Sequence, residues 1–202
     1  MVVDSQQITN FLPSAARDHC LSVLRDIHVE VKITAQRVTR HGDYKQLADG
    51  SHRITLNASP NPYRFLITLI HELAHLQAFE SNGRQIKPHG KEWKQTFTFL
   101  MAPLLRPEVF PNDLLPILAR HFRNPKASSS TDSTLAIALK VYDPPSDKSL
   151  VAELSEGTTF RLYNGKSFKR GKKRVKRIEC HEIGSGRVYL FQPHAEVEPI
   201  LM

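Results

Sequence analysis

Apolar residues recur at helical spacing through the first part of the chain. Between residues 6 and 27 they return every three or four positions, which predicts an amphipathic helix broken at Pro13. Residues 63–81 are apolar on every side, so this segment predicts a buried helix rather than a surface helix. Pro62 suits the first turn of that helix, and Asn82-Gly83 suits its end.

Shorter elements flank this central helix. Residues 28–39 alternate in part between apolar and polar side chains, and residues 53–57 do so again. They predict two strands joined by a long hairpin connection, with the second strand at a sheet edge where an extended peptide can pair. Two more helices are predicted, from about residue 89 to 102 and from about residue 112 to 123.

A polar, serine-rich stretch over residues 125–133 predicts a linker. Residues 1–124, before it, contain all the predicted helices. Residues 134–202, after it, carry short strand-like runs separated by glycine turns, which predicts a small antiparallel β module. The predicted fold class is therefore α+β. The strand-like runs are residues 160–163, 177–181 and 188–191.

Composition narrows the chemistry that the chain can carry. Its 202 residues are 40% hydrophobic and 24% charged, as in an ordinary globular protein. No signal-peptide pattern and no apolar run of about 20 residues is present, which predicts a cytoplasmic protein without a membrane partner. Only Cys20 and Cys180 supply thiols, so a four-thiolate zinc site is excluded. Any metal must rely on carboxylates and on the ten histidines.

The motif His71-Glu72-Leu73-Ala74-His75 lies inside the predicted central helix. Residues four apart share one helix face, so both imidazoles can reach a single ion. Glu72 sits beside a ligand and can act as the general base for a water without binding the metal itself. The metzincin continuation requires Gly and His at positions that hold Ala78 and Ser81 here, which excludes that class.

A catalytic zinc site needs a third protein ligand. His89 is the first candidate, because the chain turns back after residue 83 and the next helix begins near it. Glu92, one turn into that helix, is the competing ligand, and His52 and His121 are further alternatives.

The motif at 71–75, followed by His89-Gly90-Lys91-Glu92-Trp93-Lys94, resembles the SprT-like metallopeptidase family, as does the strand at 53–57. The resemblance covers residues 8–123. It implies that residues 1–124 form a minimal zincin-like catalytic domain that binds Zn²⁺ through His71, His75 and His89, with Glu72 catalytic. Relatives include the Spartan proteases, which degrade proteins crosslinked to DNA.

The tail departs from the family pattern. Many relatives carry a four-cysteine zinc ribbon there, whereas this tail has only Cys180. A second zinc is therefore not expected.

The tail is also strongly basic. The chain has a net charge of +8, and no acidic residue occurs between residues 157 and 178. Such a cluster, with aromatic residues interleaved, predicts contact with the phosphates of DNA, either single-stranded or damaged. The alternative is a solvated hairpin whose charge prevents edge pairing. The candidate residues are Lys166, Lys169, Arg170, Lys172, Lys173, Arg174, Lys176 and Arg177.

Three functions compete on this reading. The first is a zinc metalloendopeptidase whose protein substrates are bound or crosslinked to DNA. The second is a nucleic-acid-binding module with a structural or vestigial zinc site, and the third is a hydrolase of another bond. Glu72 favours an enzyme, because a purely structural site needs no base beside its ligand. The sequence leaves the oligomeric state open.

Overall fold

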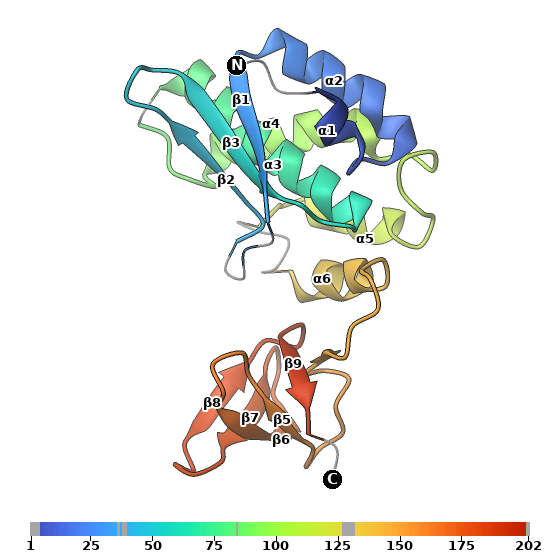
Figure 1. Cartoon of the computed structure of the whole chain (residues 1–202), viewed down its shortest axis with the longest axis vertical. Coiled ribbons are helices and arrows are strands. Elements are labelled where there is room, and N and C mark those ends of the chain that lie inside the picture. The colour runs from blue at the N-terminus through green and yellow to red at the C-terminus, as the bar shows by residue number, and fades with distance from the viewer. Residues whose placement is uncertain (1–4, 36, 38–39, 84, 127–131, 201–202) are drawn as a thin grey trace. The chain divides into compact units, whose positions relative to one another are not determined.

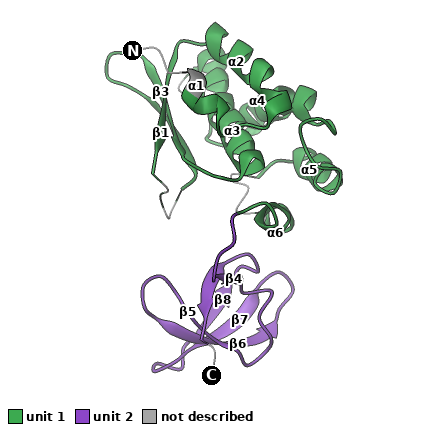
Figure 2. Cartoon of the chain, turned by 45° about the vertical axis from the view of Figure 1, so that its right-hand side comes forward, with its two compact units in different colours: residues 1–143 green, residues 144–202 purple. Residues whose placement is uncertain are grey.

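The structure, a computed structural model, has two compact units, residues 1–143 and 144–202 (Figure 2). It combines helices and two sheets, so the predicted α+β class is confirmed. No helix among the described residues is long and apolar enough to cross a membrane. The structure describes residues 5–35, 37, 40–83, 85–126 and 132–200.

The N-terminal segment forms two helices, as its spacing predicts. Helix α1 (Ser5–Thr9) and helix α2 (Arg17–Asp26) are separated at Pro13 and a 3-10 turn. Proline cannot continue a helix from within, because it lacks an N–H and its ring clashes with the preceding turn. Ile8 and Cys20 are buried in the core of the first unit, one from each helix.

Three strands, β1 (Val29–Thr34), β2 (Gly42–Gln46) and β3 (His52–Asn57), form the sheet of the first unit in the order β1-β3-β2 (Figure 1). β1 runs parallel to β3, and β2 runs antiparallel to it. The predicted two-stranded hairpin and the prediction that residues 53–57 form a sheet edge are therefore wrong. β3 is the central strand, because the presumed connection itself contributes a strand, β2.

Helix α3 (Pro62–Asn82) lies against this sheet and contributes more residues to the core than any other described element. Asn61 is fully buried and caps the helix, because its side chain accepts hydrogen bonds from the backbone N–H groups of Tyr63 and Arg64. Helix α4 (Lys91–Met101) follows and packs on α3. The apolar residues all around α3 are buried by the sheet on one side and helices on the other.

Helix α5 (Leu115–Phe122) and helix α6 (Ser133–Lys140) complete the first unit. Helix α6 lies within the predicted β module, yet its Leu135 and Leu139 belong to the core of the first unit. The boundary between the units therefore lies at 143/144, on the C-terminal side of the predicted linker at 125–133. Residues 127–131 of that linker lie outside the described residues.

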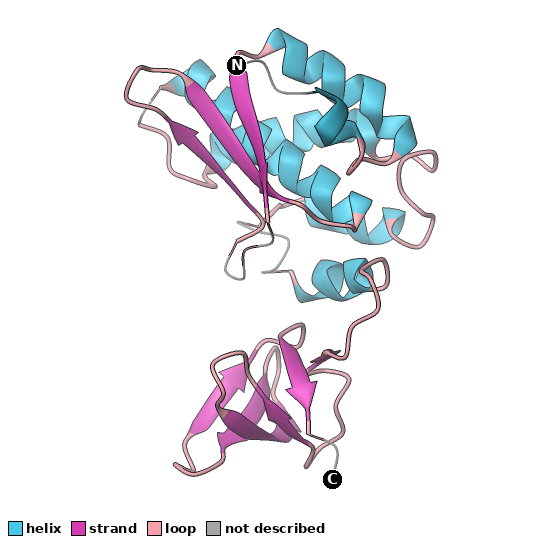
Figure 3. Ribbon diagram, in the orientation of Figure 1, coloured by secondary structure: helices cyan, strands magenta, loops and turns pink. Residues whose placement is uncertain are grey.

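The second unit is built from strands alone among its described residues (Figure 3). All its pairings are antiparallel, in the order β4-β9-β5-β6-β7-β8, which confirms the predicted antiparallel module. Phe160 and Phe168 form the centre of its own small core. The strands are β4 (Ser149–Leu150), β5 (Thr159–Arg161), β6 (Ser167–Lys173), β7 (Ile178–Glu182), β8 (Val188–Phe191) and β9 (Glu196–Pro199).

Candidate metal centre

Three histidines from two elements converge beside the central helix. His71 and His75 lie one turn apart on α3, and His89 lies in the loop just before α4. Their Nε2 atoms are 3.2 Å apart between His71 and His75, 3.0 Å between His75 and His89, and 3.2 Å between His71 and His89. The structure thus brings together the three histidines that the sequence predicts as the preferred metal ligands.

This triangle fits a metal ion better than it fits hydrogen bonding. A tetrahedral ion with nitrogen ligands at about 2.0–2.1 Å separates two of those nitrogens by about 3.3 Å, close to the observed spacing. Each neutral ring nitrogen is either a donor or an acceptor, so three that face one another leave at least one pair mismatched. Three imidazoles with room for a fourth ligand are the donor set of a catalytic zinc site.

The histidines are also held in the form that binds metals. Burial lowers the pKa of His71 to about 3 and that of His75 to about 4, and in each case another imidazole of the cluster adds to the effect. Burial also lowers the pKa of His89. All three rings are therefore neutral near pH 7, which leaves a nitrogen lone pair available to an ion.

The backbone at His89 is unusual. Among the described residues other than glycine, His89 alone has a positive φ, of 58°. It is the third residue of a turn closed by a hydrogen bond from Gly90 N–H to the Lys87 carbonyl, with Pro88 second. That turn pattern favours glycine at the third position. A histidine that occupies a glycine position is best explained by its side chain, which this conformation turns towards α3.

Trp93 on α4 packs behind the three imidazoles. Its side chain is fully buried, and its ring lies 4.6 Å from that of His71, 5.2 Å from that of His75 and 4.7 Å from that of His89, measured between centroids. The indole N–H donates to the His71 carbonyl at 3.4 Å. Trp93 therefore holds the three imidazoles in place from within the core and is not available to a substrate.

Glu72 is buried against strand β2 instead of facing solvent. The residue is 6% exposed, and its carboxylate accepts a hydrogen bond from the backbone N–H of Tyr44. Burial raises the pKa of Glu72 to about 8, and the carboxylate of Asp43 adds to the rise, while the guanidinium of Arg37 opposes it. A carboxyl group with a pKa near neutrality is well matched to taking up and returning a proton at pH 7.

Close approach of β2 to α3 depends on Gly42. A Cβ atom at this position would lie 2.8 Å from Thr68 Cγ2 and 2.9 Å from Glu72 Oε1, which real Cβ contacts do not tolerate. The sequence places Gly42 in a connection and assigns it no role. The sequence feature that could have revealed this role is a glycine within a strand, which often marks a place where another group approaches the backbone closely.

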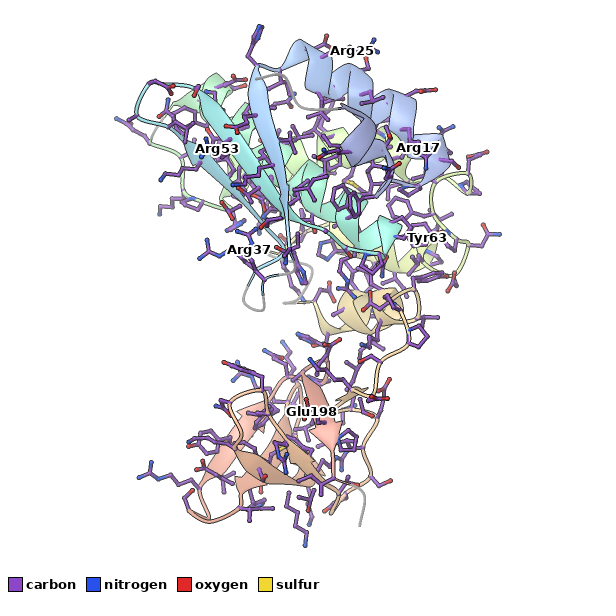
Figure 4. The ribbon with its side chains drawn as sticks, in the orientation of Figure 1. Arg17, Arg25, Arg37, Arg53, Tyr63 and Glu198 are labelled. Carbon is purple, nitrogen blue, oxygen red and sulfur yellow. The ribbon has the colours of Figure 1, made fainter. Side chains whose placement is uncertain are left out.

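A polar cluster braces the same region at one end of the sheet, where Figure 4 labels Arg37. The Arg37 guanidinium pairs with Asp43 and donates to Asn57 Oδ1 at 2.8 Å. Asn57 is itself buried and donates to the carbonyls of Arg37 and Arg40. The cluster fixes the start of β2, and with it the strand that contacts Glu72.

The other candidate ligands lie elsewhere. Glu92 is not part of the histidine group, although it lies one turn into α4. His52 Nδ1 is 2.9 Å from the Tyr44 hydroxyl, and His121 Nδ1 is 2.9 Å from Asp132 Oδ2. His52 and His121 therefore each have a hydrogen-bond partner outside the triangle of Nε2 atoms.

The eight basic candidates of the tail divide into two sets. Lys166, Arg170 and Arg174 form ion pairs with Glu182, Glu156 and Glu179 respectively. The remaining five are exposed and form no ion pair among the described residues of the tail. These five lie on β6 or in the turn between β6 and β7, namely Lys169, Lys172, Lys173, Lys176 and Arg177.

Comparison with known proteins gives one match. Residues 14–110 match the family model described as the SprT-like family. This range contains the strands of the first unit, helices α3 and α4, and the whole histidine cluster. No curated protein and no solved structure matches the chain.

Proposed function

We propose that this chain, which belongs to the SprT-like family through residues 14–110, is a zinc-dependent metallopeptidase with a minimal zincin-like catalytic domain. The observation that carries the proposal is the triangle of Nε2 atoms from His71, His75 and His89, with sides of 3.0 to 3.2 Å. Glu72 follows His71 on the same helix and is buried. Family membership supports a metallopeptidase-related function, and the geometry supplies the residues.

In this proposal His71, His75 and His89 hold the ion, and Glu72 handles the proton. Zinc in such a site acts as a Lewis acid that polarises a carbonyl and acidifies water. Glu72 takes the proton of the attacking water on its carboxylate and returns it to the leaving amine. The raised pKa of Glu72 favours holding the proton once it is taken up, a cation bound nearby would favour the carboxylate that accepts it, and the Tyr44 N–H keeps the carboxylate oriented.

The substrate strand is proposed to pair with β2, the edge strand that contacts Glu72. Asn57 N–H donates to the His41 carbonyl, and Leu47 N–H donates to the Ser51 carbonyl. In this antiparallel pair, every second residue of β2 counted from these bonds therefore hydrogen-bonds to β3. The backbone groups of Gly42 and Tyr44 therefore face away from β3. The Tyr44 N–H already serves Glu72, so the Gly42 N–H and C=O and the Tyr44 C=O remain for a substrate strand. Backbone pairing at this edge recognises an extended chain of almost any sequence, so unfolded segments are the expected substrates.

The test is hydrolysis of a loosely folded protein by the purified chain with one equivalent of zinc. Cleavage should stop on treatment with a chelator and return when zinc is restored. Absence of cleavage from a protein that carries one zinc would favour the rival function, a nucleic-acid-binding module with a structural metal.

We also propose that the five unpaired cations of the tail contact nucleic-acid phosphates, which would direct the peptidase to proteins bound or crosslinked to DNA. The supporting observation is their exposure on one hairpin without acidic partners among the described residues. Five contacts to single-stranded DNA give a slope of log affinity against log salt of about −3.5. A titration at two salt concentrations measures that slope, and no measurable binding at the lower one would end this part of the proposal.

A further inference from the structure

Strand β8 ends the six-stranded sheet and exposes three of its four apolar side chains. Val188 is 55% exposed, Tyr189 37% and Leu190 51%. Edge strands normally carry charges or prolines that prevent pairing with another chain. The segment Val188-Tyr189-Leu190-Phe191 carries neither, although Arg187 lies just before it.

The pairing of β8 with β7 shows which backbone groups are free. Glu182 N–H donates to the Arg187 carbonyl, so Cys180–Tyr189 and Ile178–Phe191 are the next bonded pairs in this antiparallel register. A separate hydrogen bond, from Ile183 N–H to the Ser167 carbonyl, shows that the residues of β7 between these pairs bond to β6 on the other side. The N–H and C=O groups of Val188 and Leu190 therefore point outward, away from the sheet.

The side chains divide in the same alternating way. Tyr189 and Phe191 turn towards the core of the unit, where their rings lie 5.5 and 5.1 Å from that of Phe168. Val188 and Leu190 lie on the opposite face and stay exposed. The outward backbone groups and the exposed apolar side chains thus belong to the same two residues, Val188 and Leu190.

Cations flank both ends of this edge. Arg187 precedes β8, and the exposed Lys176 and Arg177 lie beside its other end, because Ile178 pairs with Phe191. None of these three side chains forms an ion pair with any residue that the structure describes. The edge is therefore apolar in its middle and positive at its ends.

We propose that β8 is a docking site for an extended protein segment with an apolar, β-branched centre and acidic residues at both ends. The segment would add to the sheet as a seventh strand through the backbone groups of Val188 and Leu190. Its apolar side chains would cover Val188 and Leu190, and its acidic ends would pair with Arg187 and with Lys176 or Arg177. This site is independent of the proposed peptidase function.

The probe is a fluorescent peptide of the sequence Asp-Glu-Val-Thr-Val-Thr-Glu-Asp, titrated with the full chain and compared with a peptide whose four acidic residues are lysines. The acidic peptide should bind at least about tenfold more tightly. Leu190→Pro should weaken binding at least about tenfold, because it removes an outward N–H while leaving every bond to β7 in place. Equal binding of both peptides, or unchanged binding by Leu190→Pro, would overturn the proposal.

Two more variants guard against loss of the fold. Ile183→Ser removes an exposed apolar side chain from the turn before β8 and should leave binding unchanged. Arg187→Glu leaves the outward backbone groups of Val188 and Leu190 unchanged and should narrow the preference for the acidic peptide by at least about threefold.

Self-association through β8, detected by sedimentation and abolished by Leu190→Pro, would identify a second copy as the occupant and contradict the proposal.

Discussion

The two units present their polar groups in opposite ways. In the first unit His71, Glu72 and His75 lie on a helix enclosed by apolar residues, and burial shifts the pKa of each. In the second unit the basic side chains of Lys172 and Lys173 lie in water at one end of a sheet. Chemistry on a bond requires groups whose protonation and orientation are set in advance, whereas recognition of a polyanion requires charges that a partner can reach.

The largest effect is expected at the buried base. Glu72→Gln removes the group that takes up the proton but leaves the three imidazoles unchanged, because Glu72 is not among them. Peptidase activity should fall by about 10²–10⁴-fold or more, while zinc content stays at the parent value. Steady-state hydrolysis and metal analysis on one preparation measure both, and a Gln variant as active as the parent removes Glu72 from the mechanism.

Two strand glycines, one in each unit, allow a matched comparison. A Cβ at Gly42 would lie 2.9 Å from Glu72 Oε1, and a Cβ at Gly171 on β6 would lie 3.1 Å from the Glu179 carbonyl. Gly42→Ala should lower activity by about 10²-fold, because it displaces the carboxyl of Glu72, the proposed general base. Gly171→Ala should leave hydrolysis of a small peptide unchanged, and an equal loss of activity in both variants would show that the effect is one of general stability.

A smaller effect is expected where the segment after α6 contacts the start of α3, within the first unit. Asp143 pairs with Arg64 at 2.9 Å and accepts from Asn61 Nδ2 at 2.7 Å. Asp143→Ala leaves these largely buried donors with fewer acceptors, which should cost about 1–3 kcal/mol of unfolding free energy. Chemical denaturation measures the loss, and Asp147→Ala, at an exposed site, is the control. Equal stability of both variants would show that α6 is not anchored by this pair.

The smallest effect on the chemistry is expected in the tail. Replacing Lys172, Lys173 and Lys176 together by Ser leaves two of the five unpaired cations, so the salt slope for single-stranded DNA should shrink from about −3.5 to about −1.4. Zinc content and hydrolysis of a small peptide should stay at the parent values. A triple variant with the parent's salt slope would show that phosphates are contacted elsewhere.

Much of the first unit follows from local sequence. The spacing of His71 and His75 places two ligands on one helix face, and the turn after Asn82 returns the chain to the same point. Helix α3 was predictable to within one residue at its start and end, because Pro62 and Gly83 mark both ends. The i,i+4 pair and its flanking turns are short-range features, and such features are visible in a single sequence.

The parts that escaped prediction depend on tertiary contacts. Strand β2 has no regular apolar alternation, because its residues are partly buried against α3 as well as paired with β3. The roles of Gly42 and of the Tyr44 N–H arise only once that strand meets Glu72. Helix α6 follows a polar linker, and only its packing into the first core shows where it belongs.

The most direct test of the central claim is the zinc content of His89→Gly compared with the parent. Glycine adopts the positive φ of residue 89 without strain, so this variant removes the third imidazole while keeping the turn. We expect one tightly bound zinc per parent chain and its loss from the variant, with the circular dichroism spectrum of the fold retained. A parent without zinc, or a variant that keeps the parent's zinc through equal chelator challenge, would contradict a metal centre made by His71, His75 and His89.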